Sequence, residues 1–295
     1  MITLGLLLMI VSEAATLAKV EPFWSWNTPI AWTGFILFAD AIVWRARGNS
    51  WIRSAPREFV GLVLASIPLW LVFELYNRFI ENWHYVGLPE NPWLRYFGYA
   101  WSFATIWPAI FEGAEVMAVW RRHRLAKKSL EQSHDIHFVI APRAAAVLSW
   151  IAITIGAAML IWPLVWPSPY LAAPVWLGFI LLLEPINVRL GGESLFVNRD
   201  GQLTRIKNLA LSGMLCGVLW EFWNYWSRAK WHYTVPSMER FKIFEMPLPG
   251  YLGFPAFALE CFTMYVFVRI VVSHVTGTSR RTANRTRGFG RTIAL

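Results

Sequence analysis

The sequence contains few charged residues and only two cysteines, and these shortages exclude several classes of protein. Of the 295 residues, 15% are charged and 56% are hydrophobic, and the mean hydropathy is +0.42. A soluble domain cannot bury so much apolar surface, so a lipid bilayer must act as solvent for much of the chain. Cys216 and Cys261 lie in apolar segments without a CxxC or zinc spacing, which excludes a disulfide-rich scaffold.

The motifs of several common enzyme classes are also missing. No phosphate loop, dinucleotide fingerprint, GxSxG or HExxH motif occurs in a suitable setting, so nucleotide hydrolysis, serine hydrolase and metalloprotease chemistry have no support. A net charge of +9 could indicate nucleic-acid binding. In a membrane protein, however, basic residues gather in the cytoplasmic loops. We therefore expect no nucleic-acid partner.

Long apolar stretches are what the sequence has in abundance. A transmembrane helix needs about 20 mainly apolar residues, and eight stretches approach this length. They are residues 2–19, 30–44, 59–76, 99–120, 145–166, 171–188, 209–226 and 251–273. The prediction is an all-α integral membrane protein with about eight transmembrane helices.

The basic residues predict an orientation for these helices. If the N-terminus is cytoplasmic, twenty of the 27 Lys and Arg residues fall in inner connections or the C-terminal tail. This asymmetry predicts an inner or plasma membrane protein with both termini in the cytoplasm. We expect the chain to consist of four segments: a four-helix unit over 1–120, a basic linker over 121–144, a second four-helix unit over 145–275 and a disordered basic tail over 276–295.

The two four-helix units share sequence. Gly-Phe-Ile-Leu at 34–37 recurs at 178–181, and Trp-His-Tyr at 83–85 recurs at 231–233. The matched polar residues are Asp40 with Glu184, Glu74 with Glu221, Asn77 with Asn224, and Glu112 with Glu260. Offsets that grow from 144 to 148 fit small loop insertions after a duplication. Because four is an even number, two tandem repeats of four helices would have the same orientation in the membrane.

Repeated acids within apolar stretches need a physical explanation. One ionised carboxylate at bilayer depth costs about 2.5 to 3.5 kcal/mol, so these acids must be neutral, paired or in contact with water. Asp40 and Glu184 precede Arg45 and Arg189 by five residues, which favours structural pairs with those arginines. Glu112 and Glu260 have no base nearby in the sequence and are the first catalytic candidates, followed by Glu74 and Glu221.

Amides, histidines and tryptophans near the acids are candidates for substrate binding. Asn77 and Asn224 lie one helical turn after Glu74 and Glu221, on the same helix face. His84 and His232 could be metal ligands, but interfacial loops more often carry hydrogen-bonded structural histidines, so no metal is predicted. Trp107, Trp220, Trp223 and Trp226 could form the wall of a cavity whose aromatic faces stabilise a cation; helix packing is an equally good explanation for any one of them. Glu13 and Glu115 lack acidic counterparts in the second half of the chain. If only one half is catalytic, these two acids would mark the first half as the active one.

The order of these elements resembles the membrane lycopene cyclases of the heterodimeric or fused type. That family has two small helical repeats, each with an acidic residue, a W-x-Y element and a P-x-E-E element. The corresponding residues here are Glu74, Trp83 to Tyr85, Pro108 and Glu112, then Glu221, Trp231 to Tyr233, Pro255 and Glu260. The resemblance covers about half of the chain. It departs from the family where Glu replaces Asp and where a single Glu follows Pro at a spacing of four or five residues.

The resemblance implies a cofactor-free isomerase that acts on an isoprenoid. A neutral Glu would protonate a terminal double bond, the cation would close a ring, and a second carboxylate would remove a proton. Burial of a Glu in an apolar pocket favours the neutral form that such a step needs. Two other hypotheses stay open: a proton-coupled transporter, for which Pro108 and Pro255 are candidate helix breaks, and a non-catalytic membrane assembly subunit. The partner is expected to be a membrane lipid or isoprenoid, and the oligomeric state is left open.

Overall fold

The protein is a bundle of long helices with two small pairs of strands. The computed structural model describes residues 1–127, 142–195, 202–236 and 241–277. Its helices are α1 (Ile2–Leu17), α2 (Phe23–Arg47), α3 (Trp51–Ser54), α4 (Pro56–Ile80), α5 (Pro92–Lys127), α6 (Pro142–Val165), α7 (Ala172–Arg189), α8 (Gln202–Trp226) and α9 (Gly253–Val275). Short 3₁₀ turns, η1 (Pro169–Leu171) and η2 (Leu248–Leu252), precede α7 and α9.

Every predicted apolar stretch corresponds to one of the long helices. Among the described residues, α2, α4, α6, α7 and α9 are long and apolar enough to cross a membrane. This confirms an all-α protein with the character of a membrane protein. Helix α1 is apolar but has only 16 residues, and α5 and α8 carry several charged residues along their length. Spanning by these three helices stays a prediction.

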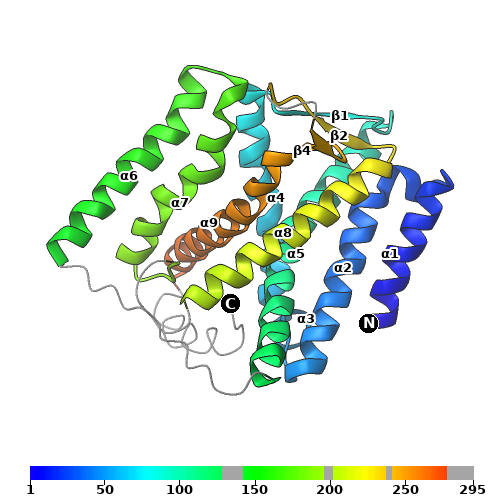
Figure 1. The fold of residues 1–295 in the computed structure, drawn as a ribbon, viewed down its shortest axis with the longest axis horizontal. Coiled ribbons are helices and arrows are strands. Elements are labelled where there is room, and N and C mark those ends of the chain that lie inside the picture. Colours follow the sequence, from blue (N-terminus) through cyan, green and yellow to red (C-terminus); the bar gives the residue numbers. More distant parts are fainter. Residues whose placement is uncertain (128–141, 196–201, 237–240, 278–295) are drawn as a thin grey trace.

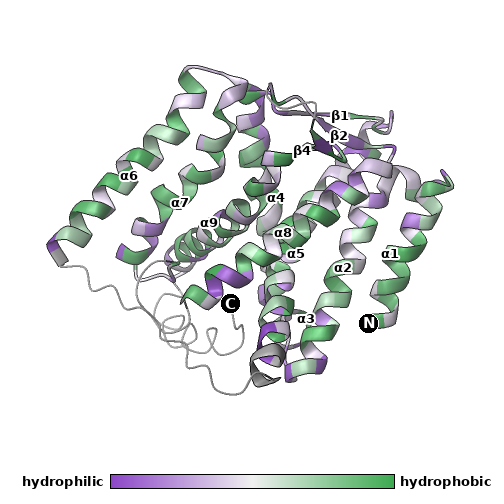
Figure 2. Cartoon of the chain, in the orientation of Figure 1, coloured by the Kyte–Doolittle hydropathy of each residue, from purple (hydrophilic) through white to green (hydrophobic). Residues whose placement is uncertain are grey.

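The helices pack in pairs that share a pattern. Helix α1 packs on α2 at one edge of the bundle and α6 packs on α7 at the other, as Figure 1 shows. Helix α2 contacts α5, α7 contacts α9, and α5 and α8 meet in the middle. Helices α1 and α6 are largely in the colour of apolar residues in Figure 2. Ile10 of α1 and Ile161 of α6 are exposed. Apolar side chains on these outer faces are suited to contact with lipid.

Glycines allow the two edge pairs to approach closely. A Cβ atom on Gly34 of α2 would lie 2.8 Å from the carbonyl oxygen of Gly5 in α1. In the other edge pair, a Cβ atom on Gly156 of α6 would lie 2.9 Å from the carbonyl oxygen of Gly178 in α7. Small residues at such crossings let membrane helices pack backbone against backbone. Gly34 and Gly178 belong to the repeated Gly-Phe-Ile-Leu motif.

Two short strands join distant parts of the chain. Strand β1 (Trp83–Val86) pairs in antiparallel fashion with β2 (Lys230–Tyr233), and His84 lies opposite His232. Strand β3 (Lys242–Ile243) pairs with β4 (Met246–Pro247). The Trp-His-Tyr segments, which the sequence predicted as interfacial loops, are therefore paired strands at one end of the bundle (Figure 1).

Parts of the predicted linker and tail lie outside the described residues. Residues 128–141 fall within the expected linker, and 278–295 make up most of the expected tail. Helix α5 continues to Lys127, and α6 begins at Pro142. Both ends of the expected linker are therefore helical.

Candidate functional site

A cavity of about 510 Å³ lies where the strand pair meets the helices. Its walls come from α2, α4, α5, α7, α8 and α9 together with β1 and β2. The aromatic lining residues are Trp26, Trp32, Trp70, Trp83, Tyr85, Tyr99, Phe103, Trp176, Trp220, Trp231, Tyr233, Phe254 and Phe257. A site of this size with mostly apolar walls, many aromatic rings and a few polar groups is suited to a small hydrophobic ligand.

The strand pair supplies alternate side chains to this cavity. Trp83 and Tyr85 of β1, and Trp231 and Tyr233 of β2, line it. The histidine between each pair does not line it, because successive side chains of a strand point to opposite faces. The Trp-His-Tyr motif thus divides into two cavity residues and one outward residue. This alternation was present in the sequence and could have identified the tyrosines, which we did not predict.

Glu74 lies directly behind the cavity wall. Its Oε1 atom accepts hydrogen bonds from the Tyr85 hydroxyl at 2.5 Å, the Trp70 indole at 2.8 Å and the Trp83 indole at 3.3 Å. All three donors line the cavity, whereas Glu74 does not. The Tyr85 hydroxyl therefore connects the Glu74 carboxyl group to the cavity.

Glu221 has the same arrangement in the second half. It is fully buried in α8, and its Oε1 atom accepts a hydrogen bond from the Tyr233 hydroxyl at 2.8 Å. Burial is the main cause that raises the pKa of both tyrosines well above the usual value. The charge of Glu74 adds to this effect at Tyr85, and the charge of Glu221 adds to it at Tyr233. The cavity therefore presents two neutral phenol hydroxyls, each bonded to a carboxyl group.

The amides beside these acids hold the strands in place. Asn77 donates to the Trp83 carbonyl at 2.7 Å and accepts from the Trp83 amide at 3.2 Å. Asn224 donates to the Trp231 carbonyl at 2.9 Å and accepts from the Trp231 amide at 3.0 Å. Neither amide lines the cavity. In the structure both amides bond to the strand backbone, and substrate binding by Asn77 or Asn224 stays a prediction.

Glu112 and Glu260 lie away from the cavity. Glu112 in α5 is 1% exposed and lies within electrostatic reach of Asp40 and Arg47. Glu260 in α9 is fully buried. Neither is among the residues that line the cavity. Hydrogen bonds from lining tyrosines therefore connect Glu74 and Glu221 to the cavity, whereas no such bond connects Glu112 or Glu260 to it within the described residues.

The acids of α2 and α7 have different partners from those expected. Asp40 accepts from the Ile52 amide at 2.9 Å. Glu184 accepts from the Ser194 hydroxyl at 2.6 Å and from the Leu195 amide at 2.9 Å. These donors follow the ends of α2 and α7, where the chain turns back toward the helix. The predicted partner Arg189 instead lies over the Trp150 ring, 4.1 Å from its centroid.

The other expected pair, of Asp40 with Arg45, is also absent within the described residues. Arg47, two positions later, forms an ion pair with Glu115. Glu13 accepts from the Asn27 amide at 3.0 Å. The two unrepeated acids therefore have structural partners in the first half of the chain.

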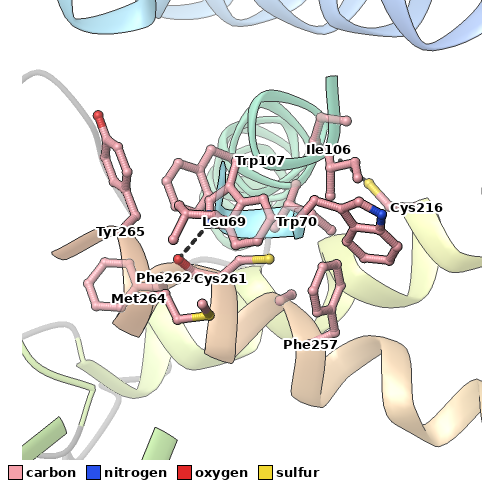
Figure 3. Packing of buried hydrophobic residues seen from close by; sticks show 14 of the residues in the cluster. Leu69, Trp70, Ile106, Trp107, Cys216, Phe257, Cys261, Phe262, Met264 and Tyr265 are labelled. Carbon is pink, nitrogen blue, oxygen red and sulfur yellow. Dashed lines mark hydrogen bonds between the residues drawn. The ribbon is translucent and has the colours of Figure 1, made fainter. Parts of the chain in front are cut away.

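Of the four predicted wall tryptophans, Trp220 lines the cavity, whereas Trp107 and Trp223 pack against other helices. The Trp107 indole donates to the Cys261 carbonyl at 2.9 Å and joins α5 to α9, as Figure 3 shows. Trp223 packs edge-on against Trp32, with ring centroids 4.8 Å apart. Neither lines the cavity, although Trp32 and Trp220 do. Trp220 and Trp223 are three residues apart in α8, and helical periodicity alone could not show which of the two lines the cavity.

The histidines form a polar cluster with an acid from the following loop. The rings of His84 and His232 lie 5.9 Å apart. Glu245 accepts from His232 Nδ1 at 2.8 Å and from Lys230 Nζ at 3.3 Å. Burial would raise the pKa of Glu245, but hydrogen bonds and charge from His232 and Lys230 outweigh this effect and lower it. Among the described residues, no group of three or more His, Cys, Asp or Glu could hold a metal ion.

Comparison of the chain with protein-family models, with curated proteins and with solved structures finds no match.

Proposed function

We propose that this protein is an integral membrane enzyme that acts on an isoprenoid or other hydrophobic lipid by carboxylate acid–base chemistry. One observation carries the proposal: an aromatic cavity whose two tyrosine hydroxyls are each bonded to a glutamate. The aromatic walls suit an apolar chain, and the two Glu–Tyr pairs supply a proton donor and a proton acceptor. The resemblance to membrane lycopene cyclases supports the same class of reaction.

The proposed reaction is an isomerisation in which no atoms are gained or lost overall. In the reacting state one glutamate is protonated and donates to the oxygen of its tyrosine, the reverse of the hydrogen bond in the structure. It passes its proton to that oxygen while the tyrosine hydroxyl releases its own proton to a double bond of the substrate. The resulting carbocation rearranges or closes a ring while the indole faces of the cavity stabilise its charge. The second Glu–Tyr pair then accepts a proton from a neighbouring carbon. Exchange of protons with water restores both Glu–Tyr pairs after each turnover. The cavity position favours Glu74 and Glu221 for these steps over Glu112 and Glu260.

We also propose that the chain consists of two tandem four-helix repeats with the same orientation. The register of β1 and β2 supports this, since equivalent residues His84 and His232 lie opposite each other. The matching helix pairs α1–α2 and α6–α7 support it as well. With both termini in the cytoplasm, the strand pair and the cavity would lie at the outer end of the bundle.

The first test compares lipid and pigment extracts from a lycopene-accumulating host that expresses the full chain or a variant. We expect the wild type to yield a lipid or pigment isomer of unchanged mass. The double variant E74Q/E221Q should yield none, because glutamine keeps the hydrogen bond from tyrosine but supplies no proton. E90Q is the matched control, since Glu90 is exposed and does not line the cavity.

Identical extracts from the wild type and E74Q/E221Q, with equal membrane expression, would refute the proposal. E112Q and E260Q separate the two candidate pairs of acids, and loss of product only in these two would move the chemistry away from the cavity. Flux of protons across proteoliposomes would indicate the transporter instead. In the structure α5 continues without interruption through Pro108, and Pro255 lies in the first turn of α9, so neither proline provides the helix break that a transporter would use.

A further inference from the structure

One face of α5 follows the cavity and changes in polarity along its length. The residues of this face that line the cavity are Leu94, Arg95, Gly98, Tyr99, Ser102, Phe103, Ile106 and Ile110. They recur at helical spacing, so they form one stripe. At a rise of about 1.5 Å per residue, the stripe from Arg95 to Ile110 is about 22 Å long. The cavity is therefore elongated, with a cation at one end and aliphatic side chains at the other.

Arg95 is the cation at the polar end of the stripe, and it has no acidic partner within the described part of the chain. Its side chain donates to the carbonyl oxygens of Pro89 at 3.0 Å and Glu90 at 3.4 Å. These contacts hold the guanidinium in place without neutralising it. Arg95 also lies in the first turn of α5, which has no acidic residue, where the helix dipole disfavours a cation. An anion beside this guanidinium would relieve that cost.

The other cation that lines the cavity is already paired. Lys230 donates to Glu245 at 3.3 Å and to the Tyr225 carbonyl at 3.1 Å. The acids nearest the cavity are also engaged, because Glu74 and Glu221 each accept a bond from a tyrosine. Arg95 is thus the lining charge that lacks compensation in the described residues.

We propose that the cavity binds a single-chain isoprenoid or lipid with an anionic headgroup, a phosphate or carboxylate, placed at Arg95 with the apolar chain along α5. This inference rests on the proposed function and names the substrate class for the same site. Guanidinium groups bind such oxyanions through two parallel hydrogen bonds. The apolar chain would lie among the tryptophans and extend toward Ile110.

The test measures ligand binding to the purified full chain in a neutral detergent. The signal is the change in tryptophan fluorescence, since seven tryptophans line the cavity. The probes are farnesyl phosphate, farnesol and inorganic phosphate. We expect farnesyl phosphate to bind at least about ten-fold more tightly than farnesol, the gain typical of hydrogen bonds to a charged group. Inorganic phosphate alone should bind far more weakly, because the buried chain supplies most of the affinity.

Variants of Arg95 connect this preference to its side chain. R95Q should bind farnesol like the wild type but lose the preference for farnesyl phosphate, and R95K should keep part of that preference. R78Q is the matched control, because Arg78 is exposed near the end of α4 and does not line the cavity. Comparison of the two probes within each variant cancels their different partition into detergent.

Each other outcome has a definite meaning. Equal binding of farnesol and farnesyl phosphate to the wild type, or an unchanged preference in R95Q, would overturn the headgroup inference and leave the proposed function in place. Tight binding of inorganic phosphate alone would assign the site to a free anion and overturn the lipid part. Failure of both farnesyl probes to bind would overturn the cavity as a lipid site and the proposed function with it.

Discussion

Glu245 shows how a single residue connects two segments at the outer side of the strand pair. It lies on the loop after β3 and contacts His232 and Lys230 of β2. Its side chain is 14% exposed. Because its pKa is lowered in the folded protein, the ionised carboxylate contributes to stability. That contribution is present above the unfolded pKa of about 4.3 and is lost as pH falls through the lower folded value.

We therefore predict that E245Q reduces the acid sensitivity of the fold. The melting temperature of the wild type in detergent should fall between about pH 5 and pH 3. In E245Q this fall should be smaller, and the variant should be less stable than the wild type at pH 6. E90Q serves as the control, because Glu90 is exposed. The same pH slope in E245Q and the wild type would contradict the importance of this contact.

Glu74 and Asn77 are residues whose contribution to the site becomes clear only from the neighbours that they contact in the structure. The sequence placed Glu74 near Trp83, His84 and Tyr85, but only the strand geometry directs the Tyr85 hydroxyl to the carboxylate. Asn77 lies on the same face of the helix and binds the Trp83 backbone. One turn of α4 therefore combines an anchor for the strand with an acid behind the cavity wall.

At the scale of elements, the helix crossings depend on glycine. The Gly34 position of α2 meets the backbone of Gly5 in α1, and backbone cannot move aside as a flexible side chain can. Gly61, in the second turn of α4, has nothing within 4 Å of its Cβ position. The two glycines therefore provide a matched pair for testing the crossing.

We predict opposite effects of alanine at these two positions. G34A should lower the free energy of unfolding by about 1–3 kcal/mol, because the added methyl group forces α1 and α2 apart. G61A should leave it unchanged or raise it by up to about 1 kcal/mol, since alanine favours a helix. Denaturation followed by circular dichroism in one detergent measures both changes. Equal stability of G34A and G61A would contradict the close crossing.

The strand pair depends on contacts outside its own ladder. Strands β1 and β2 have four residues each, and an isolated two-stranded pair is marginal in water. The amides of α4 and α8 and the two Glu–Tyr bonds anchor it to the helices. The wall of the cavity is therefore attached to the same helices that carry the proposed acids.

At the scale of the whole molecule, the distribution of charge predicts an orientation that labelling can check. Glu90 is exposed in the segment before α5, and Arg57 is exposed near the start of α4. Both native cysteines are buried, so a membrane-impermeant maleimide should label only an introduced cysteine. We predict that intact cells label E90C and that R57C reacts only after the membrane is opened. Labelling of R57C in intact cells would reverse the proposed orientation.

The sequence by itself determined the helices, the apolar class of the protein and the residues that recur. Hydropathy and helix length are local properties, so each predicted apolar stretch coincides with a helix, and the boundaries differ by up to seven residues. The repeat also selected Glu74, Glu221 and both Trp-His-Tyr segments, all of which adjoin the cavity or form its wall.

Only the tertiary structure decided which of these residues meet. It brought β1 and β2 together across more than 140 residues of chain, and it placed neither Glu112 nor Glu260 in the lining of the cavity. It also gave Asp40 and Glu184 backbone and hydroxyl donors in place of arginines. The physical reason is that polar groups in an apolar interior bond to whichever donor the packing brings near. That choice depends on contacts between helices, which no local pattern in the sequence specifies.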